Sequence, residues 1–147
     1  MAKKSLLLSA LGLVLLLTGC ALQLYPVREL VLSERYRLVA LDAILLERRM
    51  EGEVEVTSFR YLSSPYTPRS LEALGNQLQA QLESRGYQMR CKTMNALPIL
   101  GGPQYTLRMS RGNEGVGLFL RPLGEPDAYR LEVGPADPNP PLTCPAR

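Results

Sequence analysis

One stretch of the chain shows a helical repeat of apolar residues, and this repeat limits the folds that the chain can adopt. Its leucines recur at the spacing i, i+3, i+7 and i+11: Leu71, Leu74, Leu78 and Leu82. Thr67 followed by Pro68 is typical of a helix start, and Gly86 is typical of the position just after a helix end. We therefore predict one amphipathic helix over residues 68–85, with its leucine stripe buried against the rest of the domain.

Most other segments alternate between apolar and polar residues, which indicates strands. The predicted strands are residues 53–62, 87–93, 105–109, 116–121 and 128–133. Residues 35–50 fit either a helix, which Ser33 could begin and Gly52 could end, or a strand. The short Gly-containing turn before the strand at 53–62 favours a hairpin, and both interpretations stay open.

Together these elements predict an α+β domain over residues 34–133. We expect a small, mainly antiparallel sheet with one long amphipathic helix packed on one face, held by one disulfide. The 147 residues are 46% hydrophobic, which is enough for one compact domain with a modest core. Five prolines in the last fourteen residues predict a Pro-rich tail over 134–147 that has no regular structure and is tied by the disulfide.

The first nineteen residues are predicted to be a targeting segment that is removed from the mature protein. Lys3 and Lys4 precede the apolar run 6–17, which is too short to cross a hydrocarbon core of about 30 Å as a helix. Leu17-Thr18-Gly19-Cys20 follows, and this sequence resembles the lipobox of bacterial lipoprotein precursors.

This resemblance implies cleavage before Cys20, a diacylglyceryl group on its sulfur and acylation of the new amine. Residues 20–33 are then the lipid anchor and tether, and the acyl chains attach the protein to a membrane. Ala21, where inner-membrane lipoproteins often have Asp, implies the outer membrane and a domain facing the periplasm. An ordinary secretory signal or an uncleaved anchor helix are the alternatives.

Cys91 and Cys144 remain besides Cys20, and an even pair in an exported domain predicts a disulfide. The bond would close a loop of about 54 residues and contribute about 4 kcal/mol of stability through chain entropy. A redox pair or a metal site is disfavoured, because the chain has neither a CxxC spacing nor a histidine.

The composition argues against catalysis, cofactors and nucleic-acid binding. Without histidine, a nucleophile would need Lys92, the one lysine left after cleavage, yet neither GxSxG nor SxxK occurs. Glu51, Glu53 and Glu55 alternate, so we expect them on one solvent-facing side of a strand. Cleavage leaves 15 basic and 14 acidic side chains, a balance that does not suit nucleic acid. We predict that the protein is not an enzyme and has no cofactor or metal.

The predicted function is that of an accessory or assembly factor for an envelope protein complex, such as a secretion, pilus or transport machine. An inhibitor or immunity lipoprotein that blocks a periplasmic hydrolase or toxin is one alternative, and an envelope lipid or glycan binder is another. The predicted partner contact is the apolar part of the Gly- and Pro-rich loop 95–103, namely Leu97, Ile99 and Leu100. The alternative is that these three side chains lie in the core.

Overall fold

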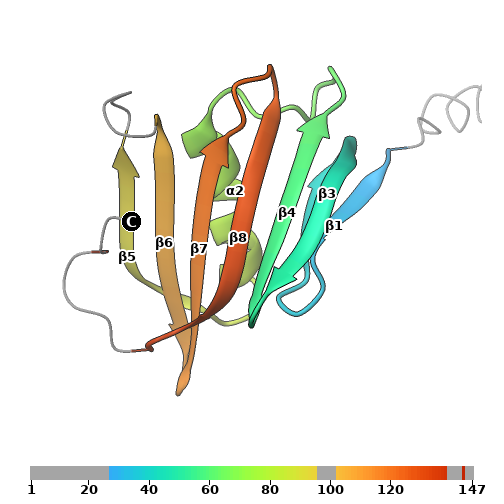
Figure 1. Cartoon of the computed structure of the whole chain (residues 1–147). Coiled ribbons are helices and arrows are strands. Elements are labelled where there is room, and N and C mark those ends of the chain that lie inside the picture. Colours follow the sequence, from blue (N-terminus) through green and yellow to red (C-terminus); the bar gives the residue numbers. More distant parts are fainter. Residues whose placement is uncertain (1–26, 96–101, 139–143, 145–147) are drawn as a thin grey trace, which may run out of the picture.

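The computed structural model describes residues 27–95, 102–138 and 144. Within them, a six-stranded antiparallel sheet is the largest unit (Figure 1). Its strands are β3 (Ala43–Glu51), β4 (Val54–Tyr61), β5 (Gln88–Asn95), β6 (Gln104–Arg111), β7 (Glu114–Pro122) and β8 (Ala128–Ala136). They lie in the order β3-β4-β8-β7-β6-β5, so β3 and β5 are the edge strands.

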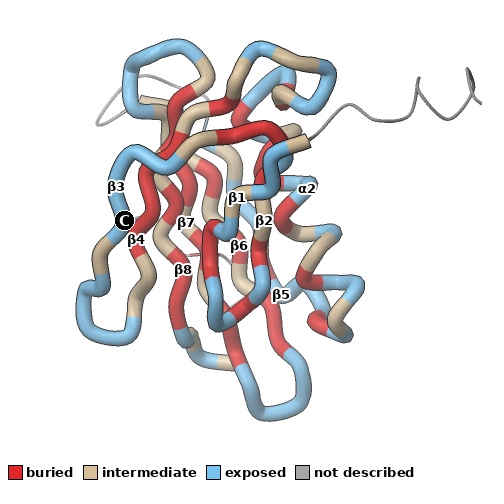
Figure 2. Tube along the Cα trace, turned by 90° about the vertical axis from the view of Figure 1, so that its right-hand side faces the viewer, coloured by how far each residue is buried: buried red, intermediate tan, exposed pale blue. Residues whose placement is uncertain are grey.

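A second layer covers one face of this sheet. It consists of the antiparallel hairpin of β1 (Glu29–Ser33) and β2 (Leu38–Leu41) together with the helix α2 (Leu71–Glu83). The hairpin contacts β3 and β4, whereas α2 contacts β5, β6 and β7. Figure 2 shows the sheet from its β3 edge, with the hairpin and α2 on the same side of it. The hydrophobic core lies between the two layers.

The predicted α+β class with a long helix is wrong. The described chain is mostly β, with two antiparallel sheets and one helix of 13 residues. The helix does not start at residue 68 as predicted. The Thr67 hydroxyl donates to the Leu62 carbonyl and accepts from the Ser64 N–H, and these bonds keep this segment in a loop. Ser70 caps the helix instead, since its hydroxyl oxygen accepts from the Ala73 N–H at 3.0 Å.

The ambiguous segment 35–50 forms a turn over residues 35–37 and then strands, which are interrupted at Asp42. This residue has a φ of 57°, a left-handed conformation that aspartate tolerates better than most residues. Its N–H donates to the carbonyl of Arg28, which directly precedes β1, and its carbonyl accepts from the Leu62 N–H beside β4. Asp42 is thus the point at which the chain passes from one sheet to the other.

The folded part is longer at both ends than the predicted range 34–133. β1 lies inside the segment predicted as a tether, and β8 continues to Ala136 through Pro135. β4 pairs with β8 only as far as Val133, so Pro135 lies where one side of β8 has no neighbouring strand in the described residues. A residue without an N–H is tolerated at such a position.

The core follows the predicted periodicity. The leucine stripe of α2 is buried, and alternate residues of β6, β7 and β8 face it. Gly75 lies in the same stripe, and a Cβ at this position would lie 2.4 Å from the buried ring of Tyr105 on β6. The helix therefore packs closely on the sheet only because position 75 has no side chain.

Burial raises the pKa of tyrosines across the core. The affected residues are Tyr36, Tyr61, Tyr87, Tyr105 and Tyr129. Desolvation of the phenolate is the largest cause in each case, and it raises the pKa of Tyr105 from 10.0 to about 12. The folded chain thus holds these protons more tightly than the unfolded chain does.

We therefore expect the protein to lose stability in alkali. The contribution is fully present below pH 10, the ordinary tyrosine pKa, and is lost as the pH rises through the folded-state values near 12. Urea unfolding at a series of pH values should give a free energy that falls between pH 10 and 12. The Tyr105→Phe variant should show a shallower fall, and a wild-type free energy that stays constant across this range would contradict the prediction.

Candidate functional site

The predicted lipidation site and the predicted contact loop both lie outside the described residues. Cys20 belongs to residues 1–26, and Leu97, Ile99 and Leu100 belong to residues 96–101. The described part of the chain begins at Val27, seven positions after Cys20. Residues 96–101 connect β5 to β6 in the sequence. The described strands on either side of them end in the pair Asn95 and Gln104.

The predicted disulfide is confirmed. Cys91 and Cys144 are bonded, with their Cα atoms 5.3 Å apart. Cys91 lies on the edge strand β5, and both residues are buried. The bond therefore ties the chain beyond β8 to the opposite half of the sheet.

Removing this bond should destabilise the domain by up to about 4 kcal/mol, since it closes a loop of roughly 54 residues. Urea unfolding of the Cys91→Ala and Cys144→Ala variants should give similar losses, and the double variant should lose no more than either single variant. Losses that add together would show that the two cysteines act independently.

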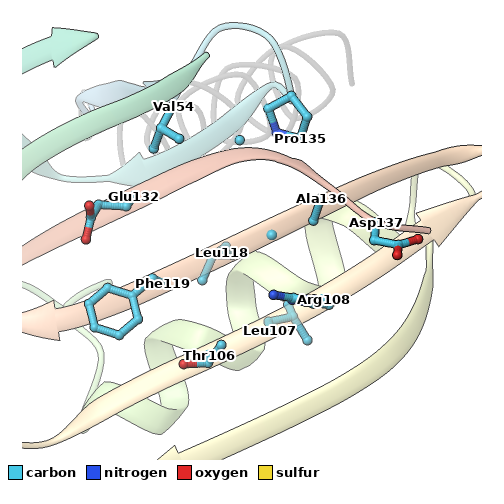
Figure 3. Close-up of a pocket in the computed structure, with 12 residues that line it drawn as sticks. Val54, Thr106, Leu107, Arg108, Leu118, Phe119, Glu132, Pro135, Ala136 and Asp137 are labelled. Carbon is cyan, nitrogen blue, oxygen red and sulfur yellow. The ribbon is translucent and has the colours of Figure 1, made fainter. Parts of the chain in front are cut away.

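The open face of the six-stranded sheet, opposite α2, carries a pocket of about 270 Å³ (Figure 3). Side chains from β6, β7, β8 and the segment after β8 surround it, including Thr106, Arg108, Phe119, Glu132 and Asp137. In Figure 3, Arg108 and Asp137 lie at one end of the pocket, and Phe119 and Glu132 lie towards the other.

Glycines make this part of the face hollow. Gly117 on β7 pairs in register with Gly134 on β8, so two neighbouring positions of the floor lack side chains. At Gly115 a Cβ would lie 2.1 Å from the Ala136 carbonyl oxygen. The chain at the end of β8 therefore passes directly over β7, where only glycine leaves room for it.

Ion pairs cover the neighbouring part of the open face. Arg49 lies 2.9 Å from both Glu47 and Glu51, and Arg130 lies 3.8 Å from Glu132 and 3.9 Å from Glu51. The exposed pairs of Arg49 contribute little stability, about 0–1 kcal/mol each, whereas Arg130 and Glu132 are less exposed, at 19% and 13%. The pairs do balance the charge, so this surface is polar without a dominant sign.

The three alternating glutamates do not share a strand face, which corrects the prediction. Glu51 ends β3, Glu53 lies in the turn, and Glu55 lies on β4. The Glu55 carboxylate accepts from the Ser33 hydroxyl at 2.7 Å and from the Glu34 N–H at 2.9 Å. Its role is to hold the β1–β2 hairpin against the large sheet.

A polar cluster joins the end of the β6–β7 hairpin to the start of β5. The Tyr87 hydroxyl donates to Glu114 at 2.8 Å, and the Arg111 guanidinium lies 3.0 Å from Glu114 and 4.6 Å from the Tyr87 ring centre. The hydrogen bond from Tyr87, followed by that from Arg111, lowers the pKa of Glu114. The cluster satisfies its own members and leaves no group prepared to attack a substrate.

Sequence reasoning missed the pocket, although a signal was present. Thr106 and Arg108 on β6, Gly115 and Gly117 on β7, and Gly134 on β8 are polar or small residues at alternate positions of neighbouring strands. Such alternation marks a face that no second layer covers. The order of the strands, which brings these positions together, was not visible in the sequence.

A comparison of the chain with protein-family models, curated proteins and solved structures finds no match. Among the described residues, no helix is long and apolar enough to cross a membrane. In the same residues, no cluster of three or more cysteine or acidic side chains is placed to hold a metal ion.

Proposed function

We propose that the protein is a lipid-anchored accessory factor of the bacterial envelope, which faces the periplasm from the outer membrane and acts by binding a protein partner. The observation that carries this proposal is the Leu17-Thr18-Gly19-Cys20 sequence after a short basic segment and an apolar run. The Cys91–Cys144 bond supports it, because disulfides persist in oxidising compartments such as the periplasm.

The chemistry of the described surface supports binding in preference to catalysis. The pocket on the open face combines Arg108, Glu132 and Asp137 with Thr106 and Phe119. This set offers hydrogen bonds, charge and one aromatic ring, and the chain has no histidine to serve as a general base. A shallow polar surface of this kind suits contact with another protein.

Crosslinking in intact cells tests the proposal. Wild-type protein isolated from crosslinked envelopes should carry one partner in near-stoichiometric amount, and the Cys20→Ala variant should lose most of it. The Asn113→Ala variant is the matched control, since it changes an exposed turn residue and keeps both the anchor and the disulfide. A partner belonging to a secretion, pilus or transport complex supports the proposal. An exported hydrolase or toxin would favour an inhibitor instead, and the absence of any crosslinked protein would contradict both functions.

A further inference from the structure

Val27, the described residue nearest in sequence to Cys20, lies at one end of the domain. Hydrogen bonds connect the chain segments at this end. The Asp42 N–H donates to the Arg28 carbonyl, and the Leu62 N–H donates to the Asp42 carbonyl at 2.8 Å. The Tyr61 N–H donates to the Asp127 carbonyl at 3.0 Å. These bonds gather the segments that we call the anchor end, at the top of Figure 1: residues 27–28, 41–42, 62–70 and 123–127.

The tether to the anchor end is short. Six residues lie between Cys20 and Val27, and the seven residue steps from Cys20 to Val27 span at most about 25 Å when fully extended. A nine-residue strand such as β3 is about 30 Å long. Acyl chains on Cys20 would therefore hold the anchor end within about 25 Å of the bilayer, which is less than one strand length.

The exposed side chains of the anchor end suit a lipid surface. Among the described residues, the two large apolar side chains exposed in loops are Tyr66 and Leu123, which are 42% and 38% exposed, and both belong to this end. Leu41, at the end of β2, is 37% exposed. Arg28 and Arg69 are exposed beside these loops, and so is Glu125, whose carboxylate lies 3.9 Å from the Arg60 guanidinium. Leucine and tyrosine favour the boundary between headgroups and acyl chains, and arginine favours lipid phosphates.

The opposite end has a different composition. Its turns contain Glu34 and Arg35 between β1 and β2, Glu53 between β3 and β4, and Asn113 between β6 and β7. All four residues are exposed, and the carboxylates of Glu34 and Glu53 and the amide of Asn113 favour water over a lipid interface. Met50, beside the β3–β4 turn, is 60% exposed, so exposed apolar surface occurs at both ends. The ends differ in their loops, which carry Tyr66 and Leu123 at the anchor end and charged or amide residues at the opposite end.

We propose that the anchor end rests on the headgroup region of the phospholipid leaflet that holds the acyl chains of Cys20, with Leu41, Tyr66 and Leu123 at the interface. This inference rests on the proposed lipidation and adds an orientation to it. The strands run between the two ends, so the sheet stands upright on the membrane. The pocket on the open face then faces sideways, and the opposite end points into the periplasm.

Because the chain contains no tryptophan, a single introduced tryptophan reports on one position alone. We would place the Tyr66→Trp, Leu123→Trp and Asn113→Trp variants of the full mature lipoprotein in phosphatidylethanolamine–phosphatidylglycerol vesicles with brominated acyl chains. The two anchor-end variants should lose most of their emission to the brominated lipid. The Asn113→Trp variant should keep its emission there and be quenched by acrylamide from the water.

Two results would overturn the inference and are distinguishable from each other. Equal quenching by brominated lipid at all three positions, in acylated protein that floats with the vesicles, would refute the orientation and leave lipidation intact. A purified chain without acyl groups that does not float would refute lipidation and the orientation together.

Discussion

Replacing Gly75 with alanine should destabilise the domain, although alanine is the better helix former. The added Cβ would lie 2.4 Å from the ring of Tyr105, which is fully buried. Overpacking of this kind costs about 1–3 kcal/mol or more, which exceeds the helix-propensity gain of about 1 kcal/mol. Urea unfolding of the Gly75→Ala variant measures the difference.

A double-mutant cycle shows whether the ring is the cause. In a Tyr105→Leu background the ring is gone, so adding Gly75→Ala should cost much less and could stabilise the domain by up to about 1 kcal/mol. Equal losses in the two backgrounds would show that the helix does not approach β6 as closely as described.

The Cys20→Ala variant should lose its attachment to the membrane. Each buried methylene of an acyl chain contributes about 0.8 kcal/mol, so loss of all the chains removes the anchor. Fractionated cells should hold the wild type in the outer membrane and the variant either as uncleaved precursor or free in the periplasm. The Asn113→Ala variant, which changes an exposed turn residue and keeps the disulfide, serves as control and should stay with the membrane. A Cys20→Ala variant that sediments with the outer membrane as wild type does would refute the lipid anchor.

Local patterns predicted those parts of the fold that depend on neighbours in the sequence. The leucine stripe of α2 is visible as a period of 3.6, and the β6–β7 hairpin is visible as alternation around a glycine turn. The disulfide could be predicted from the number of cysteines and the exported context. None of these predictions required knowledge of distant contacts.

The predictions that were wrong or missing depend on contacts between residues that are distant in the sequence. Thr67 and Ser70 both fit a helix cap, and the bond from Thr67 to Leu62 decides between them. Asp42 breaks the segment 35–50 because two sheets meet there, and Pro135 is tolerated because β4 has already ended. Each outcome depends on an element that is distant in sequence or on the strand order. The insertion of β8 between β4 and β7, which also assembles the pocket, has no local signal at all.

The lipid anchor is the central claim, and the mass of the N-terminal peptide of the mature protein tests it most directly. Protein extracted from the outer membrane should begin at Cys20 and carry a diacylglyceryl group on the sulfur and an acyl group on the amine. A chain that still contains residues 1–19, or one whose Cys20 is unmodified, would contradict the account.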